Sequence, residues 1–364
     1  MRIVNTRHHI LRDCKTHYTD AGTRDWTDDM KRDYVAFCSL LWHPGEQRLF
    51  CGVTAMDSNV LAKFNPATGR FEPLDYRPIA ESFEVKVHRS LELGADGTVY
   101  GATSCLYGLD QRRLAPGGAL FRIPPGGTPQ KLAVPLPHDY IQTITLDDQR
   151  GLIYGLTYPV FNFFVYHLAT GEVENHGFMG SITHISAIDD DGGFWSTWDN
   201  VHHYLFRYDP ATRDITYFRH GLPNAKAEAN MMYPGAGPVD CMINGGDGFL
   251  YIGTTGGQLC RLNPKTAEVT YLGKPAATTR LPGLVLWHDS LLLGAAGDNE
   301  GGCIFSYDRE TGAFRLLGPV HDAQSNRTLF RVHDLRLADK THAFVAETDV
   351  PDRSGYLWEC ELEI

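Results

Sequence analysis

The sequence has no long apolar run, no closely spaced pair of cysteines and no excess of basic residues. No stretch approaches the ~20 consecutive apolar residues of a membrane-spanning helix, so we expect no membrane segment. The 33 Lys and Arg against 44 Asp and Glu give a net charge of −11. This balance argues against a nucleic-acid partner, because binding to phosphates needs clustered basic residues. A helical apolar period over any long stretch is also missing, which argues against an α-helical fold.

The eight cysteines are scattered along the chain and form no CxxC pair. Some lie inside apparent strands, such as Cys38 in FCSLLW and Cys51 in RLFCGV, so we expect buried free thiols rather than disulfides. The opening residues MRIVNTRHHILRDCK lack the apolar stretch of a signal peptide. Together these features predict a reducing, cytoplasmic location, unless a leader has been removed from the chain.

A strand–turn–strand pattern recurs along the chain. It carries a Pro/Thr/Gly-rich turn between two short apolar runs, which is typical of a β-hairpin. The copies are FNPATGRFEPL (64–74), YHLATGEVENHG (166–177), YDPATRDITYF (208–218), LNPKTAEVTYLG (262–273) and YDRETGAFRLLG (307–318), with a degenerate copy at 121–134. They return every ~40–60 residues, the period of propeller blades.

Dividing the chain at these repeats gives seven blades and predicts an all-β, seven-bladed β-propeller that forms one domain over residues 1–364. The last blade has only three strands before the chain ends. An unpaired sheet edge at the closure would be unfavourable, so we expect RIVNTRHHIL near the N-terminus to supply the outer strand and close the ring.

Two stretches resemble known propeller families. IDDDGGFWSTWDNVHHYLFRYDPATRDITYF is similar to blades of the streptogramin-lyase and gluconolactonase-like propellers. VHRSLELGADGTVYG resembles propeller polysaccharide lyases and the related rhamnosyl-glucuronate-cleaving enzymes. In several of those lyases an inner-strand His precedes an Asp-Gly turn and a second His follows. His88 before Asp96-Gly97 matches the first position, whereas Cys105, Leu106 and Tyr107 stand where the second is expected.

Aligning the blades places polar residues near the start of most inner strands, which crowd one channel. We therefore expect these side chains to converge at one mouth of that channel. The residues are His88, Arg89, Gln142, His184, Asp240, His333 and Asp334. The alternative is that they line a water-filled channel without further function. Tyr107, Tyr158 and Trp198 follow second strands and would suit stacking on sugar rings, or ordinary packing between blades.

No cofactor is firmly indicated. His88, His184, Asp240 and His333 are also candidate ligands for a divalent metal, because mixed His and Asp ligation suits zinc or manganese. The sequence has no HxH or HExxH spacing, so the metal stays an open alternative.

These residues predict a lyase that cleaves an anionic, uronic-acid-containing oligosaccharide by β-elimination. Arg89 would neutralise the substrate carboxylate, His88 or His184 would be the base, and Tyr107 or Tyr158 the acid. Gln142, Trp198, Asp240, His333 and Asp334 would bind substrate. Two alternatives stay open: a glycoside hydrolase of the rhamnosyl-glucuronate type in the same pocket, which needs a carboxyl pair, and a non-catalytic ligand-binding or scaffold propeller.

Overall fold

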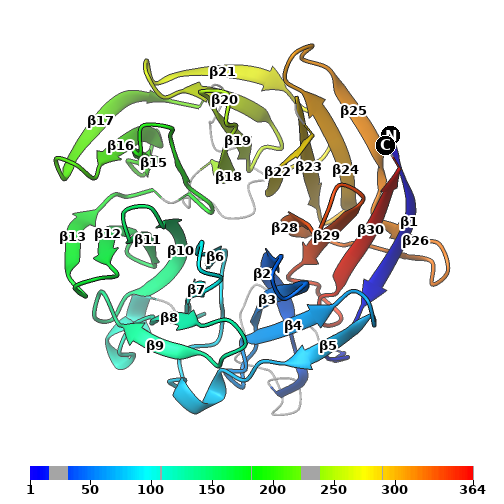
Figure 1. Cartoon of the computed structure of the whole chain (residues 1–364), viewed down its shortest axis with the longest axis horizontal. Coiled ribbons are helices and arrows are strands. Elements are labelled where there is room, and N and C mark those ends of the chain that lie inside the picture. The colour runs from blue at the N-terminus through cyan, green and yellow to red at the C-terminus, as the bar shows by residue number, and fades with distance from the viewer. Residues whose placement is uncertain (16–31, 107–108, 182, 223–237, 289, 364) are drawn as a thin grey trace.

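The chain forms seven four-stranded antiparallel sheets around a central channel (Figure 1). The computed structural model describes residues 1–15, 32–106, 109–181, 183–222, 238–288 and 290–363. Tyr107, one of the predicted residues, lies outside the described residues. The arrangement confirms the predicted all-β, seven-bladed propeller.

The strands run outward from the channel in the order in which the chain visits them. The first four blades, inner strand first, are β2 (Ala36–His43), β3 (Arg48–Thr54), β4 (Leu61–Asn65) and β5 (Arg70–Pro73); β6 (Leu91–Leu93), β7 (Val99–Ala102), β8 (Leu120–Ile123) and β9 (Gln130–Ala133); β10 (Tyr140–Asp147), β11 (Leu152–Tyr158), β12 (Asn162–His167) and β13 (Val173–Phe178); β14 (Ala187–Ile188), β15 (Phe194–Trp198), β16 (Tyr204–Asp209) and β17 (Asp214–Gly221).

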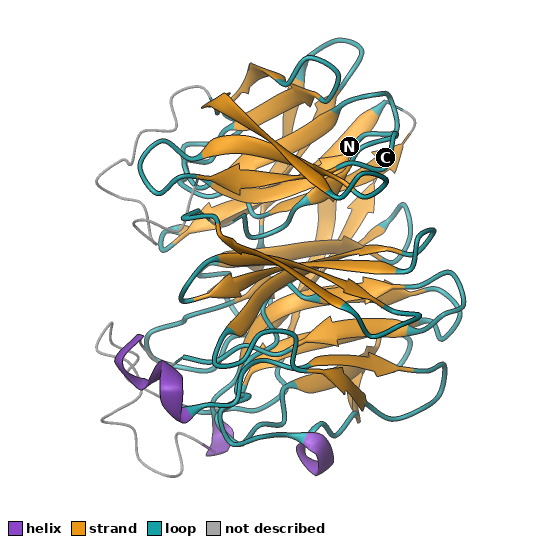
Figure 2. Cartoon of the chain, turned by 90° about the vertical axis from the view of Figure 1, so that its left-hand side faces the viewer, coloured by secondary structure: helices purple, strands orange, loops and turns teal. Residues whose placement is uncertain are grey.

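The last three blades follow the same plan, with the outermost strand of blade seven supplied by the N-terminus. They are β18 (Val239–Asn244), β19 (Leu250–Thr254), β20 (Leu259–Asn263) and β21 (Glu268–Gly273); β22 (Gly283–His288), β23 (Leu291–Asp298), β24 (Gly301–Asp308) and β25 (Phe314–Pro319); β28 (Val332–Leu337), β29 (His342–Glu347), β30 (Leu357–Glu363) and β1 (Arg2–His9). A small hairpin, β26 (His321–Asp322) and β27 (Arg327–Thr328), precedes blade seven. Two short 3-10 helices lie in connections between strands: η1 (Arg77–Ile79) between blades one and two, and η2 (Leu109–Leu114) between β7 and β8. Figure 2 shows how little of the chain is helical.

The repeated turn is built by a side chain that caps its own loop. In blade one, Oδ1 of Asn65 accepts a hydrogen bond from the Ala67 N–H at 3.1 Å. Asn263 caps blade five in the same way, with 3.0 Å to the Lys265 N–H. This Asx turn explains why Asn or Asp opens most copies of the pattern, since either side chain can replace a backbone acceptor.

Glycine in the second strand makes room for an aromatic ring in the third. A Cβ added at Gly101 would lie 2.1 Å from the Phe121 ring, far inside van der Waals contact. The same pairing recurs at Gly155 with Phe164 and at Gly294 with Phe305. The rings fill the space between neighbouring blades, which is why second strands are almost wholly buried while outer strands such as β13 are largely accessible.

The N-terminal strand closes the ring, as expected. β1 pairs antiparallel with β30, from Arg2 opposite Glu363 to His9 opposite Leu357, and the two termini lie side by side in Figure 1. Ion pairs line this seam: Arg2 with Glu363 at 2.6 Å and Arg7 with Glu361 at 2.8 Å. These exposed pairs add little stability, so the strand hydrogen bonds and the packing of Ile3 against the core of blades six and seven carry the closure.

Deletion of residues 1–11 should therefore lower the melting temperature by about 5 °C or more, because it exposes the edge of β30 and opens the ring. Differential scanning calorimetry measures the change. Val4→Lys, at a position that is 51% exposed on the same strand, is the control and should melt like the parent protein. A deletion variant with an unchanged melting temperature would contradict closure by β1.

Candidate functional site

The channel has two mouths that differ in chemistry. We call the end at which inner strands begin the strand-start mouth, and the end at which they finish the strand-end mouth. Gln142, Asp240 and His333 lie near the beginnings of β10, β18 and β28. His88 and His184 lie in the segments just before β6 and β14, which are much shorter than the sequence pattern predicts.

The short inner strand of blade two has a local cause. Lys86 makes isolated bridges to Thr54 of blade one and to Ser104, so the chain there is held between two blades rather than along one. Arg89 then adopts a left-handed conformation with φ of 49°, which breaks the strand before Leu91. A non-glycine residue in this region costs free energy and persists only where the surroundings hold it.

Three histidines from three blades meet at the strand-start mouth. The ring centroids of His88 and His333 are 4.9 Å apart, and those of His88 and His184 are 5.6 Å apart, both with edge-to-face geometry. The rings are buried, with 3% exposure for His88 and His184 and 1% for His333. Residues separated by up to 245 positions in the sequence therefore form one cluster.

The hydrogen bonds of the rings fix which nitrogen carries the proton. Nδ1 of His88 lies 2.9 Å from the Gln142 carbonyl, and Nδ1 of His333 lies 2.9 Å from the Cys38 carbonyl. A carbonyl can only accept, so each Nδ1 must donate, and in the neutral ring Nε2 is left with its lone pair. His184 directs Nδ1 to Oδ1 of Asp240 at 3.0 Å.

The cluster is held in the neutral form. Burial, together with the charge of Lys86 and the neighbouring His184, lowers the pKa of His88 well below its usual value. Burial and the proximity of His88 and Arg89 do the same to the pKa of His333. Burial also lowers the pKa of His184, although its bond to Asp240 opposes the shift. A neutral imidazole can accept a proton at neutral pH.

Asp240 forms a buried ion pair with Arg280, beside His184. Arg280 grips the carboxylate with both Nε and Nη2, at 2.9 Å and 2.6 Å, and both side chains are at most 1% exposed. Burial acts to raise the pKa of Asp240, but Arg280 and His184 outweigh it and hold that pKa far below its ordinary value. The carboxylate is thus committed to the protein rather than open to a substrate.

Part of the Arg89 guanidinium has no hydrogen-bond partner among the described residues. Its Nη2 donates to the carbonyls of Asp240 at 3.3 Å and Pro282 at 2.5 Å. Its Nε and Nη1 find no partner among the described residues, although the side chain is buried with 3% exposure. Unsatisfied buried N–H groups are costly, so this guanidinium has two donors suited to a water or an anion.

The other predicted residues divide between the cluster and its surroundings. The Gln142 amide nitrogen lies 3.5 Å from Nε2 of His88, so this residue belongs to the cluster. Asp334 is fully buried and accepts from the Leu40 N–H and from Arg336, both within 2.9 Å. The sequence predicted substrate contacts for Asp334 and Asp240, whereas both carboxylates are occupied by protein donors because each faces an arginine of a strand or loop beside it.

The two aromatic candidates among the described residues have different surroundings. Trp198 donates from its indole N–H to the Phe218 carbonyl at 3.0 Å and packs edge-on against Tyr217, so it fills blade four. Tyr158 ends β11 at the strand-start side and is 36% exposed.

Arg280, Lys86, Glu92 and Arg336 were not predicted. Arg280 lies in the loop before β22, outside the inner strand of blade six, and that strand is apolar in sequence. An alignment of the blades on their inner strands therefore does not identify Arg280. Glu92 and Arg336 line the far half of the channel. Side chains along a strand alternate between its two faces. This alternation in VHRSLEL and FRVHDLRL was the one sequence feature that could have placed Glu92 and Arg336 in the channel.

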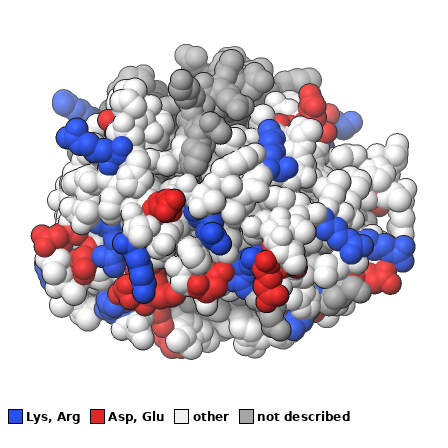
Figure 3. All heavy atoms as spheres, turned by 90° about the horizontal axis from the view of Figure 1, so that it is seen from above, with Lys and Arg blue, Asp and Glu red and all other residues white. Residues whose placement is uncertain are grey.

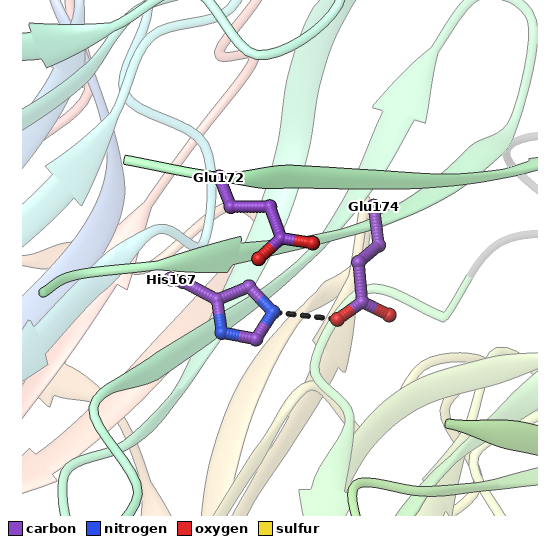
Figure 4. A group of neighbouring side chains, drawn as sticks. All are labelled: His167, Glu172 and Glu174. Carbon is purple, nitrogen blue, oxygen red and sulfur yellow. Dashed lines mark hydrogen bonds and ion pairs between the residues drawn. The ribbon is translucent and has the colours of Figure 1, made fainter. Parts of the chain in front are cut away.

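A divalent metal at the histidine cluster stays a prediction. Within the described residues, one set of three ligand-type side chains has donor atoms that all lie within 4.8 Å: His167, Glu172 and Glu174 (Figure 4). Arg213 already pairs with Glu172 at 3.0 Å and with Glu174 at 3.3 Å, so a cationic group occupies this acidic position. His88, His184, Asp240 and His333 do not form a comparable set in this arrangement.

The electrostatic character of the strand-start mouth is local. Lys86, Arg89 and Arg280 bring three positive charges to it, against Asp240 and the nearby Asp334. On the outer surface, acidic and basic side chains lie interspersed (Figure 3). A chain with a net charge of −11 thus has a cationic, imidazole-rich centre suited to an anion.

No protein-family model matches the sequence, and no curated protein matches it. Among solved structures, the chain is similar to the extracellular domain of the BT4673 hybrid two-component system from B. thetaiotaomicron, with a TM-score of 0.58 and 14% identity over 96% of this chain. A second structure of the extracellular domain, there described as a one-component system, gives a TM-score of 0.58, 14% identity and 97% coverage.

This chain spans 43% of the length of each of those structures, and the identity is low enough that the likeness concerns the fold alone. The comparisons support the seven-bladed propeller and do not support membership of a lyase family. Among the described residues, no helix is long and apolar enough to cross a membrane.

Asp240→Asn should reduce the free energy of unfolding by on the order of 3 kcal/mol, because it leaves the buried Arg280 guanidinium without its carboxylate. Urea denaturation measures the loss. Asp214→Asn is the matched control, since Asp214 is exposed on an outer strand. Equal stabilities of the two variants would show that the ion pair does not hold the channel together.

Proposed function

We propose that this chain is a carbohydrate-active lyase that cleaves uronate-containing oligosaccharides by β-elimination at the strand-start mouth. The observation that carries the proposal is the meeting of three neutral histidines at the mouth where the charge of Arg89 acts on each of them, while Nε and Nη1 of Arg89 lack protein partners among the described residues. β-Elimination needs a cation for the substrate carboxylate, a base for the C5 proton and an acid for the leaving oxygen. Arg89 and the histidines are candidates for the first two roles.

The roles follow from the hydrogen bonds. The two free donors of Arg89 bind the uronate carboxylate and make the C5 proton more acidic. Nε2 of His88 takes that proton, the C5–H electron pair forms the C4–C5 double bond, and the C4–O bond breaks. The leaving oxygen is protonated by a tyrosine, for which Tyr158 is the exposed candidate and Tyr107 the one outside the described residues.

The hydrolase alternative finds less support. It needs two carboxyl groups, one of them protonated near neutral pH. Asp240, Asp334 and Glu347 are all buried and each is paired with an arginine: Arg280, Arg336 and Arg353. These carboxylates are engaged by guanidinium groups of the protein, which suits a structural role rather than acid catalysis.

A non-catalytic, anion-binding propeller is the second candidate. The low exposure of His88, His184 and His333 favours it, because a buried cluster admits a small ligand more readily than a polymer. The similarity in fold to extracellular domains of signalling proteins is compatible with it. In that case Arg89 would bind the anion and no bond would be broken.

Incubation with a panel of uronate-containing oligosaccharides separates these candidates. Absorbance of the unsaturated product identifies a lyase, reducing sugar without absorbance a hydrolase, and calorimetric binding without product a ligand-binding protein. Arg89→Lys keeps the charge but loses the planar fork, so turnover should fall about ten-fold or more. Arg70→Lys, at an exposed site on β5, is the matched control and should be unaffected.

His88→Ala should reduce kcat far more than it changes KM if His88 removes the proton, because proton transfer matters only in the transition state. Steady-state kinetics on the best substrate of the panel gives both constants. A rise in KM at constant kcat would assign His88 to binding, and full activity in both site variants would remove the reaction from this mouth.

The pH dependence of kcat/KM should reflect the lowered pKa of the base. His88 loses its proton at a pH well below its usual value, so it stays a competent base at mildly acidic pH. The acid limb of the profile should therefore fall below about pH 6.5, the ordinary value for histidine. An acid limb centred above that value would mean that a different group is the base.

A further inference from the structure

The strand-end half of the channel holds a second cavity that the proposed reaction does not use. It has a volume of about 400 Å³, within the size range of small-molecule sites. Its charged lining residues are Glu92 from β6 and Arg336 from β28. Strands β10, β14, β18 and β22 supply the rest of the wall, so six of the seven blades contribute side chains or backbone.

Glu92 and Arg336 offer one acidic and one basic side chain, and among the described residues the two are not paired with each other. Arg336 uses Nη1 to donate to Asp334 and to the Leu335 carbonyl, both at 2.9 Å. The Glu92 carboxyl makes no hydrogen bond or ion pair among the described residues, although the charge of Arg336 acts on it. A ligand that carries both charges would complement this pair.

The pKa of the Glu92 carboxyl agrees with the absence of a cationic partner in contact among the described residues. Water reaches part of the side chain, yet burial in the narrow channel raises its pKa to about 7, against the lowering effect of Arg336 and with a smaller raising effect of Asp334. An ammonium group placed against it would stabilise the ionised form. The Glu92 carboxyl is therefore suited to bind a positively charged atom of a ligand.

The remaining wall combines an apolar side with an unused hydroxyl. Met242, Leu284 and Leu286 form part of the apolar side, and Leu286 is 49% exposed although it is a large apolar residue. Ser186 also lines the cavity; it is 4% exposed, and its Oγ has no hydrogen-bond partner in the part of the chain that the structure describes. A buried hydroxyl without a partner is the kind of group that a bound ligand satisfies.

We propose that this cavity is a binding site for a small zwitterion with an apolar flank, of the class of an amino acid with an aliphatic side chain. The carboxylate of the ligand lies against the guanidinium of Arg336 and its ammonium group against Glu92. The aliphatic part covers Leu286 and its neighbours. The site is distinct from the histidine cluster and does not depend on the reaction proposed there.

Isothermal titration calorimetry with leucine tests the proposal. Three further probes each remove one feature: isocaproate lacks the amine, isoamylamine lacks the carboxylate, and glycine lacks the aliphatic side chain. Leucine should bind in the millimolar range or tighter, and each of the three probes should bind about ten-fold more weakly or worse. Absence of leucine binding at millimolar concentration would overturn the proposal, as would isocaproate binding as tightly as leucine.

Two variants locate the binding. Glu92→Gln keeps the shape and should weaken leucine binding about ten-fold, while Glu268→Gln, an exposed carboxylate on β21, is the matched control and should leave it unchanged. Leu286→Ser removes an exposed apolar contact and should weaken leucine but not glycine. Thermal melting verifies that each variant is folded. Leucine affinity equal to that of the parent protein in both Glu92→Gln and Leu286→Ser would place the binding elsewhere and refute the site.

Discussion

The buried ion pair between Asp240 and Arg280 organises the centre of the propeller. Arg280 lies before blade six, grips the carboxylate of blade five and donates to the Val332 carbonyl of blade seven at 3.4 Å. The same carboxylate orients His184 ahead of blade four, and the Asp240 carbonyl accepts from Arg89 of blade two. Burial of two charges is costly, so the pair gains its value by linking blades four to seven rather than by its own energy.

This arrangement separates two environments along one channel. At the strand-start mouth, cationic side chains and desolvation keep three imidazoles neutral, beside two guanidinium nitrogens of Arg89 without a partner among the described residues. At the strand-end mouth the desolvated group is a carboxyl, Glu92, and among the described residues it has no cation in contact. Asp334 lies between the two, held by Arg336 and by the Leu40 N–H. The two mouths therefore favour different ligands even though the same inner strands build both.

The rim of the molecule serves a different purpose. Asx turns such as that of Asn65 recur from blade to blade, as do glycine–aromatic pairs such as Gly155 with Phe164. They recur because each blade has the same turn between its outer strands and packs against its neighbours in the same way. The closure by β1 completes the last blade and leaves no open strand edge at the seam. A rigid ring of this kind lets residues at the channel stay in strained conformations, as Arg89 does.

The sequence alone determined the fold, because the repeated turn is compatible with few structures other than a β-hairpin. It also determined the closure, because the unpaired edge of blade seven needed a fourth strand. The same repeats indicated which positions face the channel, and so His88, His184 and His333 could be named together. Only the tertiary structure decided what these residues can do. It showed that Arg280 enters from a loop and occupies Asp240, that Trp198 packs within its blade, and that Glu92 lies unpaired in a cavity. These contacts join blades that are far apart in the chain. The sequence pattern of one blade does not show which of its charged side chains is paired with a residue of another blade.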